Sequence, residues 1–490
     1  VAEFYKAGGL KALEEIPGIG KSIAQKIEEY IKTGHIQYFD ELKRRLPVNL
    51  EEITAIEGVG PKKAKILYQT LGIKTLDDLE RAAKTHQIAS LAHFGQKSEE
   101  NILQGINFQR RSHGRFLLGD ILPQAREILE KIKKFENIER ADLVGSLRRR
   151  KETIGDIDIL AILALKADKN TASKLMDYFT SLEGVEKIWG KGLTKASVRM
   201  QQGFDMDLRI LPKKSYGAAL QYFTGSKEHN IVLRRLAIGK GLKLSEYGLF
   251  KGVKMLASAS EEDIYRQLDL CPIPPEIREN EGEIQAAALN KLPKLISYNS
   301  LKGDLHCHSN WDGGSNSIEE IALSAIGRGY EYVGIADHTK YLQIEHGLDE
   351  KKLIKRNQQI DQINAKFRQQ GKNFVVLKGC EANILDNGEI DIDSRILAEL
   401  DFVIAGIHSN MKITKDEMTN RILKAIENPD VDIISHPTGR LIKKRDEYAV
   451  DLEKIFTTAQ KTGTILEINS NPARLDLKDL YIRRAKDYGI

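Results

Sequence analysis

The stretch TIGDIDIL, residues 153–160, places two aspartates one residue apart inside an apolar, β-branched run. Such a run predicts a strand, and residues i and i+2 of a strand point to the same side. The carboxylates of Asp156 and Asp158 are therefore expected side by side on one face. Repulsion between them is costly unless a cation or a raised pKa relieves it. The stretch predicts either a metal site or a proton shared between the two acids.

The overall composition limits the classes of protein to which the chain can belong. A chain of 490 residues is too long to fold around one hydrophobic core, so we expect three or more domains. With 41% hydrophobic and 30% charged residues, the composition is that of a globular protein. A net charge of +5 permits a nucleic-acid partner without requiring one. We expect no membrane span, because no apolar run is long enough, and the few scattered cysteines favour a reducing cytoplasm.

A repeat occupies the N-terminal region. The segment IPGIGKSIAQKI (16–27) returns as IEGVGPKKAKIL (56–67), and each copy predicts a glycine turn followed by an amphipathic helix with lysines. Paired glycines let a backbone approach another molecule closely, and amides at a helix start favour an anion. The repeat resembles the helix-hairpin-helix motif, which implies phosphate contacts with DNA; ordinary helical hairpins are the alternative. The glycines concerned are Gly18, Gly20, Gly58 and Gly60.

From about residue 119 onward the pattern becomes mixed α/β. We expect helices over 122–135 and near 172–182, a strand over 204–211, and a helical stretch over 217–240. These elements surround the aspartate pair and predict an α+β domain.

A turn suited to a triphosphate precedes the aspartate pair. Gly145 and Ser146 fall at a predicted strand-to-helix turn, where backbone amides, a hydroxyl and an arginine can contact phosphates. A neighbouring predicted strand, DMDLR (205–209), offers a third acid at Asp205 or Asp207. Two metal ions bridged by such carboxylates would activate an attacking hydroxyl and neutralise a leaving pyrophosphate, which predicts nucleotidyl transfer. The plainer alternative is that the acids cap an edge strand or pair with nearby arginines.

Taken together, these residues resemble a known family. The series G-S, G-D-x-D, D-L-R and Y-F-T-G-S, preceded by two helix-hairpin-helix copies, is similar to the family X DNA polymerases over residues 1 to about 290. In that family the third catalytic aspartate directly precedes a hydrophobic residue and an arginine, which selects Asp207. The resemblance implies catalysis by Asp156, Asp158 and Asp207 with Mg²⁺ or Mn²⁺. It also implies nucleotide contacts by Gly145, Ser146, Arg149, Gly155, Tyr222, Phe223, Gly225 and Asn230.

The resemblance also implies substrates and a role. We expect a monomer that fills gaps in gapped or primer–template DNA with deoxynucleoside triphosphates, in base-excision repair. Lys26 falls where the lyase members of the family carry a Schiff-base lysine, although Ser22 replaces another lysine of that pattern.

A second predicted site follows a linker. Beyond residues 292–303, short apolar strands alternate with helices, which is typical of a parallel sheet or barrel with its active site at the carboxyl ends of the strands. Histidines and an acid fall at those ends. Imidazoles with carboxylates suit zinc, manganese or iron, and a cluster of such ions would activate water against a phosphodiester.

This region resembles the PHP phosphoesterase domain, a distorted (β/α)7 barrel, over about 300 to 490. The resemblance implies a 3′–5′ exonuclease or phosphoesterase that uses Mn²⁺, Zn²⁺ or Fe, with Glu381 bridging the metals. The family's last motif, Asp-x-His, is missing and the first residue is not Met, so we expect a fragment that lacks both ends. The implied ligands are His306, His308, Asp312, His338, Glu381, His408 and His436.

The expected architecture is multidomain: an all-α helix-hairpin-helix region, an α+β nucleotidyltransferase palm and thumb, and a truncated (β/α)7 barrel. We expect a lyase-like domain over residues 1–47, fingers over 48–118 and a palm over 119–211. A thumb over 212–291, a linker over 292–303 and the PHP domain over 304–490 are expected to follow.

Other functions remain open at this point. One is a PHP nuclease whose polymerase half only binds DNA, which the intact aspartates oppose. A DNA-binding scaffold with inactive sites is opposed by two nearly complete ligand sets. Template-independent nucleotidyl transfer stays open, because no feature of the sequence reports template use.

Overall fold

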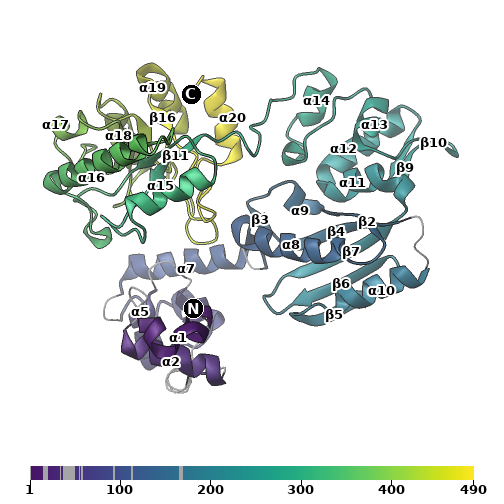
Figure 1. Cartoon of the computed structure of the whole chain (residues 1–490), viewed down its shortest axis with the longest axis horizontal. Helices are drawn as coiled ribbons and strands as arrows, with labels where there is room; N and C mark the ends of the chain where they lie inside the picture. The colour runs from purple at the N-terminus through teal and green to yellow at the C-terminus, as the bar shows by residue number, and fades with distance from the viewer. Residues whose placement is uncertain are drawn as a thin grey trace. The chain divides into compact units, whose positions relative to one another are not determined.

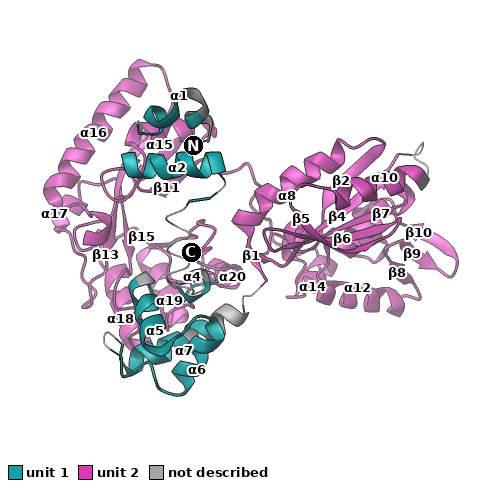
Figure 2. Ribbon diagram, turned by 90° about the horizontal axis from the view of Figure 1, so that it is seen from below, with its two compact units in different colours: residues 1–113, 443–445 teal, residues 114–442, 446–490 magenta. Residues whose placement is uncertain are grey.

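The computed structural model describes residues 2–14, 20–33, 35–36, 50–54, 56, 59–91, 94–111, 114–164 and 169–490. The chain forms two compact units, residues 1–113 with 443–445 and residues 114–442 with 446–490 (Figure 2). The six predicted segments divide the chain more finely than this, and their boundaries stay a prediction. Among the described helices, none is both long enough and apolar enough to cross a membrane.

The first unit is helical, as the sequence predicts. Aliphatic side chains of its later helices form one core, in which Ile53, Leu67 and Ile102 are buried. The helix over residues 61–71 begins after Gly60 with a proline in its first turn, and Gly72 ends it with a φ of 67°. The helices are α1 (Ala2–Glu14), α2 (Lys21–Thr33), α4 (Leu50–Thr54), α5 (Pro61–Leu71), α6 (Leu76–Lys84) and α7 (Gln96–Arg111).

The second unit begins with a five-stranded sheet in the order β2-β4-β7-β6-β5 (Figure 1). The central strands β4 and β7 run parallel, and the other neighbouring pairs are antiparallel. A short two-stranded ribbon, β1 (Phe116–Leu117) with β3 (Thr153–Ile154), precedes β4. The strands of the sheet are β2 (Ile138–Leu143), β4 (Asp156–Leu163), β5 (Val185–Lys191), β6 (Lys195–Met200) and β7 (Asp205–Leu211).

The quoted stretch forms β3 and most of β4, and its side chains alternate between two environments. Ile157 and Ile159 pack with α8 (Leu118–Lys133) and α10 (Lys169–Thr180) in one core. Leu160 and Ile162 point to the opposite face, where they pack with residues of α11 (Tyr216–Thr224). Because side chains alternate along a strand, the two aspartates lie on this second face, ahead of the apolar residues. The helices predicted at 122–135 and 172–182 are α8 and α10, each beginning and ending a few residues earlier.

The region expected to form the thumb differs from the sequence prediction in one respect. The helical stretch expected over 217–240 is two helices, α11 and α12 (Lys227–Gly239). Gly225 breaks it with a φ of 72°, a left-handed conformation that a glycine adopts without strain, and Ser226 caps the second helix. The rest of this region contains β8 (Lys243–Ser245), β9 (Gly248–Lys251), β10 (Lys254–Ala257), α13 (Glu261–Gln267) and α14 (Glu283–Ala288).

The C-terminal region, residues 303–490, is built on a six-stranded sheet whose strands follow the order of the chain and pair in parallel. This is the expected βα architecture, with six strands rather than the seven of the complete barrel. The strands are β11 (Gly303–Cys307), β12 (Tyr332–Ile335), β13 (Val375–Asn383), β14 (Phe402–Gly406), β15 (Ile433–Ile434) and β16 (Ile465–Leu466). The helices are α15 (Ile318–Gly327), α16 (Glu350–Gln369), α17 (Ser394–Leu397), α18 (Lys415–Ile426), α19 (Leu452–Thr462) and α20 (Asp479–Asp487).

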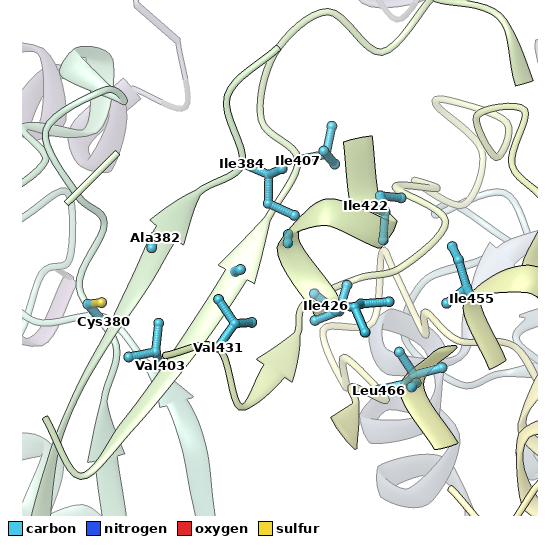
Figure 3. Packing of buried hydrophobic residues seen from close by; sticks show 14 of the residues in the cluster. Cys380, Ala382, Ile384, Val403, Ile407, Ile422, Ile426, Val431, Ile455 and Leu466 are labelled. Carbon is cyan, nitrogen blue, oxygen red and sulfur yellow. The ribbon is translucent and has the colours of Figure 1, made fainter. Parts of the chain in front are cut away.

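Alternation along β13 separates the core of this domain from its polar site. Cys380 and Ala382 pack in an aliphatic cluster with residues of α18 and α19, such as Ile422 and Ile455 (Figure 3). Glu381 therefore points to the other side of the sheet, although it too is buried.

Close packing between α11 and the start of α13 gives a test of the fold. A Cβ added at Gly217 would lie 2.3 Å from backbone atoms of Ser260, which cannot move aside as a flexible side chain can. We predict that Gly217→Ala destabilises this region by about 1–3 kcal/mol. Amide hydrogen exchange in α11 and α13 should then be about tenfold faster or more. Gly239→Ala, at the open end of α12 with nothing within 4 Å, should leave exchange unchanged or slower; equal effects of the two substitutions would contradict the predicted clash.

Candidate functional sites

Parallel pairing of β4 with β7 brings four aspartates to one face of the sheet. In the register of this pair, Asp156 lies opposite Asp205 and Asp158 lies opposite Asp207. Neighbouring residues of an in-register parallel pair point to the same side, so the four carboxylates lie on the face that also carries Leu160. The arrangement concentrates negative charge at one end of the two central strands.

The pKa values of two of these acids are raised by burial and, to a smaller extent, by this concentration of charge. Burial raises the pKa of Asp158 to about 7, and the carboxylates of Asp156 and Asp207 contribute to the rise. The pKa of Asp156 is also raised, first by burial and next by Asp207. Both of the alternatives drawn from TIGDIDIL, a cation or a shared proton, would relieve this repulsion.

The two candidates for the third acid have different partners. Asp205 accepts hydrogen bonds from Trp189 Nε1 at 2.9 Å and Arg199 Nη1 at 3.1 Å. Asp207 pairs with the ammonium group of Lys195, whose Nζ lies 2.7 Å from Oδ2. Asp207 contributes to the raised pKa of both Asp156 and Asp158, which agrees with its selection as the third acid in the sequence-based prediction.

The turn between β2 and the short helix α9 (Gly145–Arg148) touches the same acids. Gly145 has a φ of 63°, and a Cβ there would lie 2.3 Å from Asp158 Oδ2, so the close approach requires glycine. The hydroxyl of Ser146 is buried and has no hydrogen-bond partner among the described residues. A buried hydroxyl without a partner is costly, and a bound phosphate oxygen would satisfy it.

Arg149 is already ordered by contacts from the thumb. Its Nε donates to Glu279 Oε1 at 2.7 Å, and its Nη1 donates to the carbonyl oxygen of Thr224 at 2.5 Å. Two of its nitrogens are thereby engaged, and no hydrogen bond of Nη2 is seen among the residues that the structure describes. A Cβ at Gly225 would lie 3.0 Å from Nη1, so this glycine makes room for the guanidinium group. Gly155 likewise lies beside a guanidinium group, because a Cβ added there would lie 3.3 Å from Nη1 of Arg115.

The remaining predicted nucleotide contacts lie on α11 and α12. The rings of Tyr222 and Phe223 meet edge to face with centroids 5.1 Å apart, and the guanidinium group of Arg209 lies over Phe223. Asn230 donates to the carbonyl oxygen of Tyr222 at 2.7 Å and accepts from Gln221 at 2.7 Å. The Asn230 amide is thus held inside the protein, and its predicted contact with a base stays a prediction.

The N-terminal glycines are only partly described. Gly18 and Gly58 lie outside the described residues. Gly20 accepts the first hydrogen bonds of α2, from the backbone amides of Ile23 and Ala24, and Gly60 is the N-cap of α5. Among the described residues, an added Cβ at Gly20 or Gly60 would meet nothing within 4 Å. Lys26 lies half-buried on α2.

The second site gathers around one carboxylate at the strand ends of the C-terminal sheet. Glu381 is 2% exposed at its side chain, and its two oxygens face the imidazoles of neighbouring strands. Each oxygen–nitrogen distance falls between 2.9 and 3.5 Å, to His306, His308, His338, His408 and His436. The parallel strands bring together these residues from segments more than 100 positions apart in the sequence.

Neighbouring charges and burial have opposite effects on the pKa values of Glu381 and His306 in this cluster. Burial would raise the pKa of Glu381, but the imidazoles of His306 and His408 hold it well below its usual value. Burial would lower the pKa of His306, but Glu381 holds it well above the usual value. Burial lowers the pKa of His436 to about 4, so this imidazole is neutral at neutral pH. A neutral imidazole has a lone pair available for a metal ion.

The donor set fits a transition metal. Nδ1 of His436 is buried without a hydrogen-bond partner among the described residues. Asp312 lies close to two of the imidazoles: its Oδ2 is 2.7 Å from His308 Nδ1 and accepts from the backbone amide of His338 at 2.9 Å. Potential ligand atoms lie within 4.8 Å of one another in three groups: His306, His308 and Glu381; His308, Asp312 and His338; His338, Glu381 and His408.

Sequence reasoning missed three residues of this site. Glu467 contacts His306, Asn383 contacts His408, and the hydroxyl of Ser435 donates to Glu381 at 2.8 Å. Glu467 follows the apolar strand TIL, so the strand-end rule that selects the histidines would also have selected it. No comparable signal marks Asn383 or Ser435.

Known protein families match three parts of the chain. The DNA polymerase beta thumb family matches residues 219–279, the SAM-like helix-hairpin-helix tandem family residues 50–107, and the PHP domain family residues 304–471. A Bacillus subtilis protein, DNA polymerase/3′-5′ exonuclease PolX, is 37% identical over 479 residues, which are 97% of this chain and 82% of that protein. The chain belongs to the family X DNA polymerases that carry a PHP domain.

Two further proteins are similar to shorter stretches of this family X chain. DNA polymerase lambda of Rattus norvegicus is 27% identical over 287 residues, 52% of this chain and 46% of that protein. A protein of Syntrophotalea carbinolica named as a probable phosphatase is 31% identical over 173 residues, 34% of this chain and 65% of that protein. The chain is thus similar both to a polymerase and to a probable phosphatase.

The raised pKa of Asp158 predicts how the metal-free chain responds to pH. Folding raises this pKa from 3.8 to about 7, so the folded chain holds the proton more tightly and loses that stability as the pH rises through 7. In the Asp158→Asn variant the side chain cannot ionise, so the variant does not lose this stability as the pH rises. In the presence of a chelator, its unfolding temperature should exceed that of the wild type by more at pH 8 than at pH 5. Glu136→Gln, at an exposed loop, is the control, and a difference independent of pH would contradict the prediction.

Proposed function

We propose that this chain is a template-directed DNA polymerase that fills short gaps, and that its PHP domain is a 3′–5′ exonuclease or phosphoesterase. The observation that carries the polymerase half is the in-register pairing of β4 and β7, which places Asp156, Asp158 and Asp207 on one face beside the Ser146 turn. The extent of the match to the Bacillus subtilis protein, whose name states both activities, supports both halves.

In the polymerase site, Asp156, Asp158 and Asp207 would hold Mg²⁺ or Mn²⁺, because adjoining carboxylates are the oxygen ligands that hard divalent cations prefer. When bound, such ions lower the pKa of an attacking hydroxyl and neutralise a leaving pyrophosphate. The chain's own groups position the nucleotide. The Ser146 hydroxyl and the backbone amides of its turn bind the triphosphate, and Arg149 presents Nη2 to it.

The sugar and base of the nucleotide would lie on the other side of the site. Tyr222 and Phe223 provide an aromatic surface at the end of α11, next to the break at Gly225. Tyr222 would disfavour a ribose 2′-hydroxyl and thereby select deoxynucleotides. The N-terminal helix starts at Gly20 and Gly60 would contact the phosphates of the DNA without reading its bases.

In the PHP domain, the cluster around Glu381 would hold Mn²⁺, Zn²⁺ or Fe, since imidazoles with carboxylates suit these metals. Such ions supply an activated water for hydrolysis of a phosphodiester. Both oxygens of Glu381 would take part in holding such ions, because one faces His306, His308 and His338 while the other faces His408 and His436.

The proposal extends to the setting of the activity. We infer a monomer that works on gapped DNA with deoxynucleoside triphosphates in base-excision repair. Cys271, Cys307 and Cys380 are free thiols, which fits a reducing cytoplasm. Removal of a deoxyribose phosphate at Lys26 stays a prediction.

The choice of Asp207 over Asp205 gives a sharp test of the polymerase site. On a one-nucleotide gapped duplex, we predict that Asp207→Asn slows incorporation by about 1,000-fold, because it removes a cation ligand worth several kcal/mol in the transition state. Asp205→Asn is the matched control, since it lies on the same strand face but is held by Trp189 and Arg199. It should keep incorporation within a few-fold of the wild type.

The same reactions distinguish the alternative functions. Equal losses in the two aspartate variants would contradict the assignment of Asp207. No extension by the wild type, with the primer still shortened, would leave a nuclease that uses its polymerase half only to bind DNA. Extension of a single strand as readily as of the gapped duplex would indicate template-independent transfer. Shortening of the primer should disappear in His338→Ala and persist in Asp207→Asn, since the two activities belong to separate sites.

A further inference from the structure

Glu467 lies directly after β16 and reaches two histidines of the PHP site from the same edge of the sheet. Its Oε1 lies 2.5 Å from Nδ1 of His306, and its Oε2 accepts from the backbone amide of His436 at 2.7 Å. Oε2 also accepts from the side-chain amide of Asn469 at 3.2 Å. The Glu467 side chain is 12% exposed, so these donors rather than water hold the carboxylate in place.

The contact to His306 decides which ring nitrogen can bind a metal. A carboxylate that accepts a hydrogen bond from Nδ1–H keeps a proton on that nitrogen, so the proton that a metal ion would displace is the one on Nε2. In this chain, Nε2 of His306 lies 3.2 Å from Glu381 Oε2, on the side of the ring that faces the cluster. Glu467 therefore orients the ring and exposes Nε2 to the centre of the site.

Two other histidines of the cluster have the same kind of support. Nδ1 of His308 lies 2.7 Å from Asp312 Oδ2, and Nδ1 of His408 lies 2.8 Å from Asn383 Oδ1. In both rings, Nε2 again faces Glu381, at 3.5 and 3.2 Å. Three imidazoles thus share one pattern, with Nδ1 on an outer oxygen and Nε2 toward the centre.

Glu467 also connects two strand ends. Its backbone amide donates to the carbonyl oxygen of Ile434 in β15, while its side chain holds the amide of His436 just beyond that strand. The distance between His436 and His306 is therefore set partly by one carboxylate that contacts both. This link adds rigidity to the part of the site formed by β11, β15 and β16.

We propose that Glu467 is a positioning residue of the PHP metal centre, which fixes the tautomer and orientation of His306 without binding the metal itself. The inference rests on the proposed function of the cluster around Glu381. Loss of such an outer partner weakens metal binding by about 10- to 100-fold.

Mn²⁺ affinity tests this role directly. The variants are made in a chain that also carries Asp156→Asn and Asp158→Asn, so that Mn²⁺ reports on the PHP centre alone. Free Mn²⁺ is measured by electron paramagnetic resonance during titration, which gives both the affinity and the number of ions bound. We expect Glu467→Ala to weaken Mn²⁺ binding about 10- to 100-fold with an unchanged number of ions. Glu467→Gln, which keeps an acceptor for His306, should weaken it less.

Two controls separate positioning from a structural effect. Glu427→Gln changes an exposed carboxylate after α18 in the same domain and should leave the affinity unchanged. The unfolding temperature of the metal-free Glu467→Gln chain should match that of its parent, so that weaker binding by this variant does not reflect loss of fold.

Each other outcome overturns the proposal in a distinct way. An unchanged affinity in Glu467→Ala would show that His306 needs no such partner. Loss of one bound ion in Glu467→Ala, with the remaining ion held as tightly as before, would make Glu467 a ligand rather than a positioning residue. If the parent chain takes up no Mn²⁺, the proposed metal centre itself is wrong, and the inference falls with it.

Discussion

The constraint on which the polymerase site depends is the register between β4 and β7. Because the two central strands run parallel and in step, aspartates spaced two apart on each strand meet on one face, Asp156 and Asp158 beside Asp205 and Asp207. The chain accommodates this charge locally: Lys195 and Arg199 pair with the acids of β7, and burial raises the pKa of Asp158 to about 7. The glycine at 145 follows from the same constraint, since the turn after β2 passes too close to Asp158 for any side chain. Repulsion between these carboxylates favours the binding of a cation, which would relieve it.

The PHP site also gathers charged and polar side chains at one edge of a parallel sheet, but from successive strand ends. Its strands are parallel and in chain order, so polar residues that end successive strands converge at one edge. The centre is a single buried carboxylate, that of Glu381, and imidazoles surround it. In the polymerase site, by contrast, the neighbours of each aspartate include other aspartates. Imidazole nitrogens and a shared carboxylate select softer metals than a group of aspartates does. On the proposed function, one chain would carry two sites for phosphate chemistry, and their different ligands would favour different ions.

Much of both sites follows from sequence periodicity, and the remainder depends on tertiary contacts. The shared face of Asp156 and Asp158 follows from alternation along a strand, and the histidines follow from their places after apolar runs. Periodicity could not show that Trp189 and Arg199 hold Asp205 while Lys195 holds Asp207, because those partners come from neighbouring strands. It also could not show that Asn383 supports His408. The break at Gly225 within the expected helix over 217–240 was missed because the glycine lies in a stretch with helical hydrophobicity, and only its φ of 72° reveals the turn.

On the proposed function, the face that carries four aspartates binds cations through three of them. The most direct measurement is anomalous diffraction from crystals of the wild-type chain grown with Mn²⁺, gapped DNA and a non-hydrolysable deoxynucleotide. We expect Mn²⁺ peaks in contact with Asp156, Asp158 and Asp207, with Lys195 moved away from Asp207 and Asp205 still held by Trp189 and Arg199. Crystals in which the nucleotide is bound, no peak lies at these carboxylates and Lys195 stays on Asp207 would contradict it.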